Sequence, residues 1–197
     1  MIQAGGRSTR MGGRPKALLE VGGHRIIERV VAALSPVLGD PLIVTNSPEL
    51  YGFLGLPMVG DAHPDHGSLG GIYSGLAAIA ADAAFTVACD MPFLHPDLVR
   101  LVVERAPSGD VVVPRVGDQL ETMHACYARR CLPAIGEQLS ARRLKIAGFF
   151  PQVHVVEVPE VEIRRIRDPA LAFMNVNTPD ELERARDLAR RVDGDGR

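Results

Sequence analysis

The residues whose types could do chemistry gather near the start of the chain, in the segment 4–16. It contains four glycines, three arginines, one lysine and two hydroxyl residues. Glycines let backbone N–H groups approach an anion closely, and fixed cations neutralise its charge. The alternative is a solvated basic N-terminus. Because the segment follows a short apolar start and precedes a helix-forming stretch, we favour a loop that binds a polyphosphate.

The spacing within this segment excludes two familiar phosphate-binding patterns. No Gly-Lys-Ser or Gly-Lys-Thr stands at the distance that a P-loop requires, and no Gly-x-Gly-x-x-Gly is present. The polyphosphate prediction therefore does not depend on a mononucleotide or dinucleotide fingerprint.

Strand-like apolar runs alternate with helical periodicity along the rest of the chain. The patterns predict strands at 41–46, Met58–Val59, 85–89, 111–114, 121–128, 153–158 and 172–176. They predict helices at 24–38, 72–83, 97–106, 131–139 and Pro179–Val192, the last with Thr178 as its N-cap. This alternation is typical of a parallel sheet covered on both faces. We therefore predict a three-layer α/β/α sandwich, Rossmann-like, with a mostly parallel central sheet, as one domain over 1–192 followed by a polar tail at 193–197.

Small, amide or carboxylate residues follow five of the predicted strands, where open α/β sheets bind ligands. Taken singly, each is more typical of a turn. Together they predict a site at one edge of the sheet. The residues are Gly5, Gly6, Thr45, Asn46, Asp61, Asp90, Asn175 and Asn177.

Composition and charge narrow the class of protein. The chain has 197 residues, 46% of them hydrophobic and 23% charged, with a formal net charge of −2. This balance argues against binding nucleic acid or a membrane surface. No apolar run is long enough to span a bilayer, and no signal peptide is apparent. Three cysteines without a CxxC spacing fit a reducing cytoplasm.

Several motifs carry a resemblance to one family. The segment 4–16 matches the Ala-Gly-Gly-x-Ser-x-Arg-Met-Gly-x-x-x-Lys signature of nucleotidyltransferases that join a nucleoside triphosphate to a phosphorylated acceptor. Residues 175–182, 89–92, 67–71 and 121–127 resemble further motifs of the molybdenum cofactor guanylyltransferases, the MobA family. The resemblance runs through nearly the whole chain.

The sequence also departs from the family pattern. Gln3 replaces the usual leucine, Pro15 stands where aspartate commonly precedes the lysine, and Ser68 and Gly70 replace proline and alanine. None of these changes removes a charge that the chemistry needs. Only three residues precede the loop, so we expect a short and thinly held first strand.

The resemblance implies transfer of GMP from GTP to the phosphate of molybdopterin cofactor, with release of pyrophosphate. It implies catalytic roles for Lys16, Arg10 and Asp90, with Asp90 holding Mg²⁺. The implied GTP- and cofactor-binding residues are Gln3, Ala4, Gly5, Gly6, Lys16, Asn46, Asp61, Leu69, Gly70, Asp90, Asn175 and Asn177. Molybdoenzyme-maturation proteins are a further expected class of partner.

Alternatives stay open at this point. Asp90 could be a helix cap, and the 175–179 motif could be no more than a helix start. The acceptor or base could differ, as in a cytidylyltransferase or a sugar-phosphate nucleotidyltransferase, and a nucleotide-binding module without turnover is a rival of another class. A zinc site around Asp61, His63, Asp65 and His66 lacks a closed ligand set.

Two further sets of residues are open to interpretation. His124 is either an acceptor contact or a half-buried histidine. Five arginines could bind an anionic pterin or a partner protein, but exposed helix faces are the more common explanation. These are Arg142, Arg143, Arg164, Arg165 and Arg167.

Overall fold

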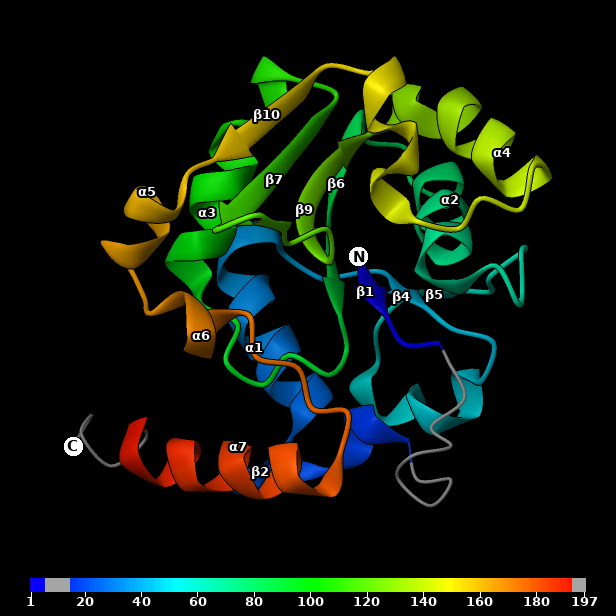
Figure 1. The fold of residues 1–197 in the computed structure, drawn as a ribbon. Coiled ribbons are helices and arrows are strands. Elements are labelled where there is room, and N and C mark those ends of the chain that lie inside the picture. The colour runs from blue at the N-terminus through cyan, green and yellow to red at the C-terminus, as the bar shows by residue number, and fades with distance from the viewer. Residues whose placement is uncertain (6–14, 193–197) are drawn as a thin grey trace.

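The main sheet of the protein is mixed but mostly parallel. A computed structural model describes residues 1–5 and 15–192 (Figure 1). Within them the strand order is β10-β7-β9-β6-β1-β4-β5, and β8 pairs with β7 outside this path. The strands are β1 (Ile2–Gln3), β4 (Ile43–Val44), β5 (Met58–Val59), β6 (Ala83–Ala88), β7 (Val111–Val116), β8 (Gln119–Leu120), β9 (His124–Ala128) and β10 (Val155–Val158). Only β8 and β9 run antiparallel to their neighbours in this described sheet.

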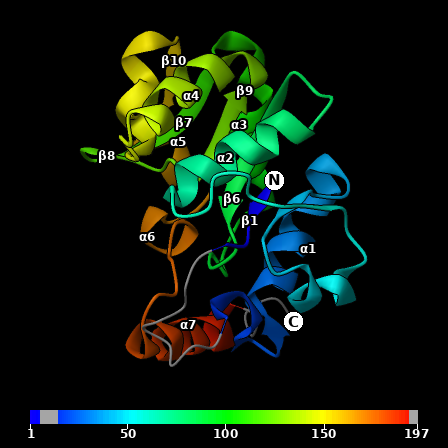
Figure 2. The same cartoon turned by 90° about the vertical axis from the view of Figure 1, so that its right-hand side faces the viewer.

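Helices cover both faces of this sheet, which confirms the predicted three-layer sandwich. In Figures 1 and 2, α2 (Gly67–Ala78) packs beside α4 (Leu132–Ser140) on one face, and α1 (Ile26–Leu38) packs beside α3 (Pro96–Glu104) on the other. The remaining helices are the short α5 (Glu160–Arg164) and α6 (Pro169–Ala172) and the longer α7 (Pro179–Val192).

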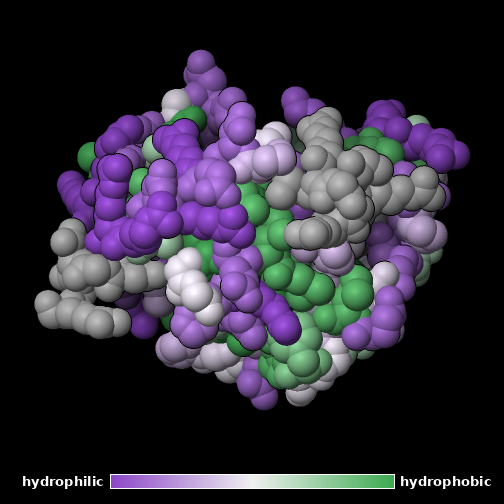
Figure 3. Space-filling view, turned by 90° about the horizontal axis from the view of Figure 1, so that it is seen from below, coloured by the Kyte–Doolittle hydropathy of each residue, from purple (hydrophilic) through white to green (hydrophobic). Residues whose placement is uncertain are grey.

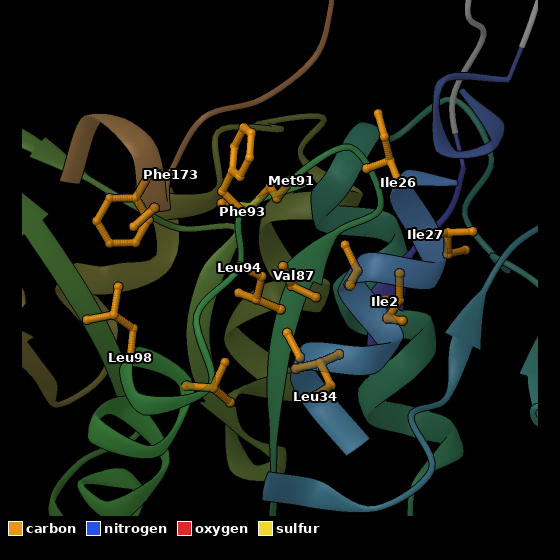
Figure 4. Packing of buried hydrophobic residues seen from close by; sticks show 14 of the residues in the cluster. Ile2, Ile26, Ile27, Leu34, Val87, Met91, Phe93, Leu94, Leu98 and Phe173 are labelled. Carbon is orange, nitrogen blue, oxygen red and sulfur yellow. The ribbon is translucent and has the colours of Figure 1, made fainter. Parts of the chain in front are cut away.

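Each face of the sheet has its own hydrophobic core because successive residues of a strand point to opposite sides. In β4, Ile43 packs in the core with α1 and α3, whereas Val44 packs in the core with α2 and α4. Figure 4 shows the first core, where Ile2 and Val87 lie close to Leu34 of α1. The two apolar faces explain why the central strands are apolar at almost every position.

The first strand is short but is held on both sides. Ile2 lies opposite Ile43 of β4 and Val87 of β6. Backbone hydrogen bonds extend the pairing beyond β1: Ala4 N donates to Val44 O at 2.9 Å, and Cys89 N donates to Gln3 O at 3.1 Å. The expected weakness at this central position is therefore compensated by pairing to two neighbours.

A smaller layer lies below the carboxyl ends of the parallel strands, in the lower part of Figure 1. It consists of the short helix η2 (Lys16–Leu18), the hairpin of β2 (Glu20–Val21) and β3 (His24–Arg25), and α7. Arg186 of α7 donates to the backbone oxygen of Glu20 at 3.1 Å. Seen from below in Figure 3, this end of the molecule has hydrophilic residues on one side and hydrophobic residues toward the middle.

Two predicted elements differ from the structure. The predicted strand at 172–176 is wrong, because the chain leaves α6 at Ala172 and continues without strand pairing to α7. The predicted helix at 72–83 begins earlier, at Gly67, and ends at Ala78, so the glycine-rich segment is its first turns and not a loop. Glycine lowers helix propensity, but packing against the sheet overrides that preference here.

Smaller differences concern element ends. Residues 24–25 form a strand and α1 begins at Ile26, whereas the helix was predicted from residue 24. The strand predicted at 121–128 begins only at His124, after a turn. The helix Pro179–Val192 has the predicted bounds. None of the described helices has the length and hydropathy that crossing a bilayer requires.

Candidate active site

Three side chains from distant parts of the chain meet at the carboxyl edge of the sheet. Lys16 Nζ donates to Asn177 Oδ1 at 2.7 Å and lies 3.8 Å from Asp90 Oδ2. The Lys16 and Asp90 side chains are 23% and 17% exposed. The cluster is thus partly shielded from water yet open to a ligand. We call Lys16, Asp90 and Asn177 the central cluster.

Asp90 is positioned by the end of β6 and by the segment before α7. The strand ends at Ala88, and Val176 N donates to the backbone oxygen of Asp90 at 2.9 Å. Burial raises the pKa of the Asp90 carboxyl above its usual value, and the nearby Lys16 ammonium opposes that shift. A buried carboxylate that faces a cation is a common feature of sites where ions bind or react.

Asn177 is held by the start of α7. Glu181 Oε2 accepts hydrogen bonds from Asn177 N at 2.7 Å and Thr178 N at 2.9 Å, and Thr178 Oγ1 accepts from Glu181 N at 3.2 Å. This is a capping box, in which the two side chains satisfy the free backbone donors at a helix start. It confirms Thr178 as the N-cap. Glu181 was missed by the sequence analysis, although Thr178-Pro179-Asp180-Glu181 carries the S/T-x-x-E pattern of this motif.

A second polar group follows β4 and β5. Asp61 N donates to Asn46 Oδ1 at 2.7 Å, and Asn46 Nδ2 donates to the Asp61 backbone oxygen at 3.2 Å. Ser74 of α2 donates from Oγ to Asp61 Oδ1 at 2.9 Å. Asn46 and Asp61 therefore form one fixed unit at the end of the sheet, and Ser74, which the sequence analysis did not select, anchors it to α2.

Gln3 lies against the first turns of α2. A Cβ added to Gly71 would stand only 1.9 Å from Gln3 Oε1, so a larger residue there would displace the Gln3 amide. Gln3 Nε2 is buried and has no hydrogen-bond partner among the described residues. Burying such a donor unpaired costs free energy, which makes Gln3 Nε2 a candidate for a contact with a ligand.

Other predicted site residues have different surroundings. Leu69 is fully buried in the core beneath α2, so only its backbone can face a ligand. Ala4 is buried, and a side chain at Gly70 would clash with His63.

Asn175 lies apart from the central cluster. Its Nδ2 donates to the Phe173 backbone oxygen at 3.1 Å. Gly6 and Arg10 lie outside the described residues, while the neighbouring Gly5 is exposed.

His124 is not the half-buried residue that was predicted. Its ring is fully buried between Phe85 and Phe173, with centroid distances of 4.9 and 5.0 Å. Burial lowers the pKa of His124 to about 3. An uncharged ring stacked edge-on against two phenyl rings belongs to the core, and it presents no surface to an acceptor.

The structure also places the histidines near Asp61 and the five arginines whose roles the sequence left open. His63 lies edge-on to His66 and to Tyr73, at 5.8 and 5.0 Å between ring centroids. No group of three or more histidine, cysteine or acidic side chains suited to a metal ion occurs within residues 1–5 and 15–192. Arg143 bonds Gln138 near the end of α4 and Arg164 pairs with Glu160 in α5, so the five arginines do not form one surface (Figure 1).

Comparisons with known proteins show the family of this chain. A sequence model of the MobA-like NTP transferase domain matches residues 1–152. The chain belongs to this family. A relative from Pelotomaculum thermopropionicum, named a probable molybdenum cofactor guanylyltransferase, is 43% identical over 96% of this chain and 92% of its own length. Another, from Desulfosudis oleivorans, is named molybdenum cofactor guanylyltransferase and is 34% identical over 94% of this chain and 92% of its own length.

Among solved structures, the family fold recurs in molybdopterin-guanine dinucleotide biosynthesis protein A from Archaeoglobus fulgidus. It superimposes with a TM-score of 0.83 at 24% identity, covering 96% of this chain and 97% of the other. The fold class and the family resemblance predicted from the motifs are therefore confirmed.

Proposed function

We propose that this protein is a molybdenum cofactor guanylyltransferase, which transfers GMP from GTP to the phosphate of the molybdopterin cofactor. The observation that supports this most is the convergence of Lys16, Asp90 and Asn177 at the carboxyl edge of the sheet. Relatives of nearly the same length, up to 43% identical, are named for this activity.

The reaction joins two anions, so positioning and charge neutralisation carry most of the catalysis. An oxygen of the acceptor phosphate attacks the α-phosphorus of GTP. A new P–O bond forms there, while the bond from the α-phosphorus to the oxygen bridging it to the β-phosphorus breaks. Pyrophosphate leaves with that oxygen and its electron pair. Lys16, whose ammonium lies within the central cluster, would neutralise charge on the α-phosphate.

Mg²⁺ fits the oxygen donors of the central cluster. Asp90 supplies a largely buried carboxylate, and Asn177 supplies an amide oxygen that accepts a hydrogen bond from Lys16. Magnesium commonly takes one or two protein carboxylates and completes its shell with water and substrate phosphates. Asp90, assisted by Asn177, would hold the ion. Once bound there, it would neutralise phosphate charge and polarise the P–O bonds.

The nucleotide side of the site would include the β1, β4 and β5 ends. The Asn46–Asp61 unit is rigid and half exposed, suited to a sugar or base contact. Gln3 Nε2, a buried donor without a described partner, would bond an acceptor atom of the nucleotide. Backbone groups of Ala4, Gly5, Gly6, Leu69 and Gly70, with Arg10, complete the proposed contacts, and Asn175 would lie nearer the acceptor.

The deciding experiment is a comparison of nucleotides. The purified protein is incubated with Mg²⁺, molybdenum-loaded molybdopterin and either GTP or CTP, and released pyrophosphate is measured. GTP should support turnover that depends on the acceptor and on Mg²⁺. A preference for CTP would point to a cytidylyltransferase, and turnover only with a sugar phosphate would indicate another acceptor. Nucleotide binding without any turnover would favour the non-catalytic module.

The proposal also covers the compartment in which the protein acts and the partners that receive its product. We propose that residues 1–192 act as one domain in the cytoplasm and pass the product to molybdoenzyme-maturation proteins, with no role in binding nucleic acid. The free thiols of Cys89, Cys126 and Cys131 are consistent with a reducing compartment.

A further inference from the structure

A cavity of about 420 Å³ lies beside α1, on the face of the sheet that α1 and α3 cover. Its walls come from β3, α1, the segment between β6 and α3, the segment between α5 and α6, and the last residue of α7. In the view of Figure 1, the segment after β6 passes between α1 and α6, with α7 below. No residue of the central cluster lines the cavity. Its volume is in the range of small-molecule sites, about 300–1,000 Å³.

Arg167 brings an unpaired polar atom to this cavity. It lies between α5 and α6, so the interpretation as part of an exposed helix face does not apply to it. Its Nε is buried and has no hydrogen-bond partner among the described residues. A guanidinium keeps its charge in proteins, so the cost of burial cannot be relieved by loss of a proton. A bound anion would give this group the partner that the described residues do not supply.

His95, which also lines the cavity, lies close enough to Arg167 to feel its charge. Burial lowers the pKa of His95, the charge of Arg167 lowers it further, and Asp97 opposes both effects. Asp97 N donates to His95 Nδ1 at 3.3 Å, so in the neutral ring Nε2 is the nitrogen that carries the proton. His95 Nε2 is therefore a second donor for an anion beside Arg167.

The other ionisable groups of the α1 wall leave the cavity with an excess of positive charge. Arg29 lines it as a second guanidinium, and its Nε donates to the Pro92 backbone oxygen at 3.0 Å. Glu28 is the one carboxylate among the described lining residues, and its Oε2 accepts from Arg25 N at 2.7 Å. Because the start of α1 already engages Glu28, this carboxylate does not serve as the partner of Arg167.

Apolar surface lies next to these cations. Ala32 and Ala33 of α1 line the cavity, as do Phe93 and Leu94 of the segment after β6, which Figure 4 labels. The Cζ atom of Arg29 lies 5.7 Å from the centroid of the Phe93 ring. Apolar walls with a few charged donors suit an organic anion better than a bare inorganic ion.

We propose that this cavity binds a small organic anion, a carboxylate or a phosphate monoester with an apolar body, apart from the active site. Arg167 and His95 would donate to its anionic oxygens, since a guanidinium forms strong charge-assisted hydrogen bonds with carboxylates and phosphates alike. The apolar body would lie against Ala32 and Phe93. This inference does not depend on the proposed function.

Calorimetric titration of the whole protein with three probes tests for an anion and identifies its class. We expect phenyl phosphate, benzoate or both to bind. Benzyl alcohol, a neutral molecule with the same ring, should bind at least about tenfold more weakly. Binding of only one of the two anions would identify the ligand as a phosphate ester or as a carboxylate. Equal affinity for the alcohol and the anions, or no binding of either anion, would overturn the proposal.

Two variants locate the anion in the cavity. Arg167→Met removes the guanidinium but keeps an apolar stem, and Ala32→Phe fills the cavity from an exposed position of α1. Each should weaken anion binding about tenfold or more. Arg165→Met, at an exposed arginine of the same segment that does not line the cavity, is the matched control and should bind like the wild type. Thermal unfolding without anion checks that the variants fold, and Arg167→Met should not lower Tm, because it removes an unpaired buried donor.

Lys16→Ala separates the cavity from the active site, since phenyl phosphate could also bind at the central cluster. Anion binding that is kept in Lys16→Ala and lost in Arg167→Met and Ala32→Phe supports the cavity. Binding that is lost in Lys16→Ala and kept in Arg167→Met would assign the anion to the central cluster and overturn the inference. Hydrogen exchange adds a readout of place: amides in 92–95, which line the cavity, should exchange more slowly with the anion bound, and unchanged exchange there would contradict the proposal.

Discussion

Lys16 is the residue on which the chemistry depends most. Its ammonium is placed by η2 within 2.7 Å of Asn177 and 3.8 Å of Asp90, where an incoming phosphate would bring negative charge. A preorganised cation of this kind acts most strongly in a partly shielded site, because water screens it less.

Replacing Lys16 should therefore reduce turnover without unfolding the protein. We expect Lys16→Ala to lower kcat about 10²–10³-fold, the size seen when one preorganised charge-stabilising group is lost. Steady-state pyrophosphate release measures the effect, and Arg184→Ala, an exposed cation on α7, is the control. Near wild-type turnover in Lys16→Ala would remove this lysine from the mechanism.

Gln3 should lower the stability of the unliganded protein while it strengthens the binding of the nucleotide. Its Nε2 is buried without a described partner, a cost of about 1–3 kcal/mol in an unliganded protein. Gln3→Leu should raise Tm by about 2–6 °C while raising KM for GTP, if the amide contacts the nucleotide. Thermal unfolding and GTP kinetics check the two effects, and a higher Tm with unchanged KM would make Gln3 only a packing residue.

At the scale of elements, the start of α7 places Asn177. Glu181 accepts from both Asn177 N and Thr178 N, so its removal frees the segment that carries the amide. We expect Glu181→Ala to lower Tm slightly, since caps are worth about 1 kcal/mol, and to lower kcat about tenfold.

Glu183→Ala is the matched control on the same helix. Among the described residues, Glu183 pairs only with Arg186 on the exposed face, so its loss should leave both Tm and kcat nearly unchanged. Because Glu181 acts by positioning, a shift in the Mg²⁺ concentration needed for half-maximal rate should accompany the loss of kcat. An unaltered magnesium dependence with lower Tm would make the capping box purely structural.

Element types were predictable where burial and local pattern agree. The buried strands β6 and β7 and the amphipathic α7 follow directly from apolar runs and 3.6-residue periodicity. Residues 172–176 are as apolar as a strand, but they are covered by the core and bonded to Asp90 without strand pairing. The segment 67–71 is helical although it is rich in glycine, and Gly71 packs closely against Gln3. This contact is tertiary, so the periodicity of the sequence does not reveal it.

At the scale of the whole molecule, one sheet brings side chains from several strand ends to the same edge. The Asn46–Asp61 unit follows β4 and β5, and Asp90 of the central cluster follows β6. The motifs contain Lys16, Asp90 and Asn177, which the structure brings together, because strand ends and family spacing are readable in sequence. Their roles stay predictions. The contact between Gln3 and Gly71 was not predictable, since it joins two distant segments that share no spacing in the sequence.

Burial of His124 between Phe85 and Phe173 makes the free energy of unfolding depend on pH. Its pKa is about 3 in the folded state and about 6.5 when unfolded, so the unfolded chain binds more protons between these values and stability falls as pH falls. When the pH falls from about 7 to about 5, His124 should lower the free energy of unfolding by about 2 kcal/mol.

His124→Leu should remove that part of the acid sensitivity. Denaturant unfolding at both pH values measures it, with His24→Leu, at an exposed histidine of β3, as the control. An equal loss of stability with acid in the wild type and in His124→Leu would contradict the burial of an uncharged imidazole.

The most direct test of the account follows the α-phosphorus of GTP in a single turnover with molybdopterin and Mg²⁺. Label in the α-phosphate should appear in a molybdopterin guanine dinucleotide, and label in the γ-phosphate should appear only in pyrophosphate, with both products lost together in Lys16→Ala. Transfer of the γ-label to the acceptor, or release of pyrophosphate without a labelled dinucleotide, would contradict nucleotidyl transfer at the central cluster.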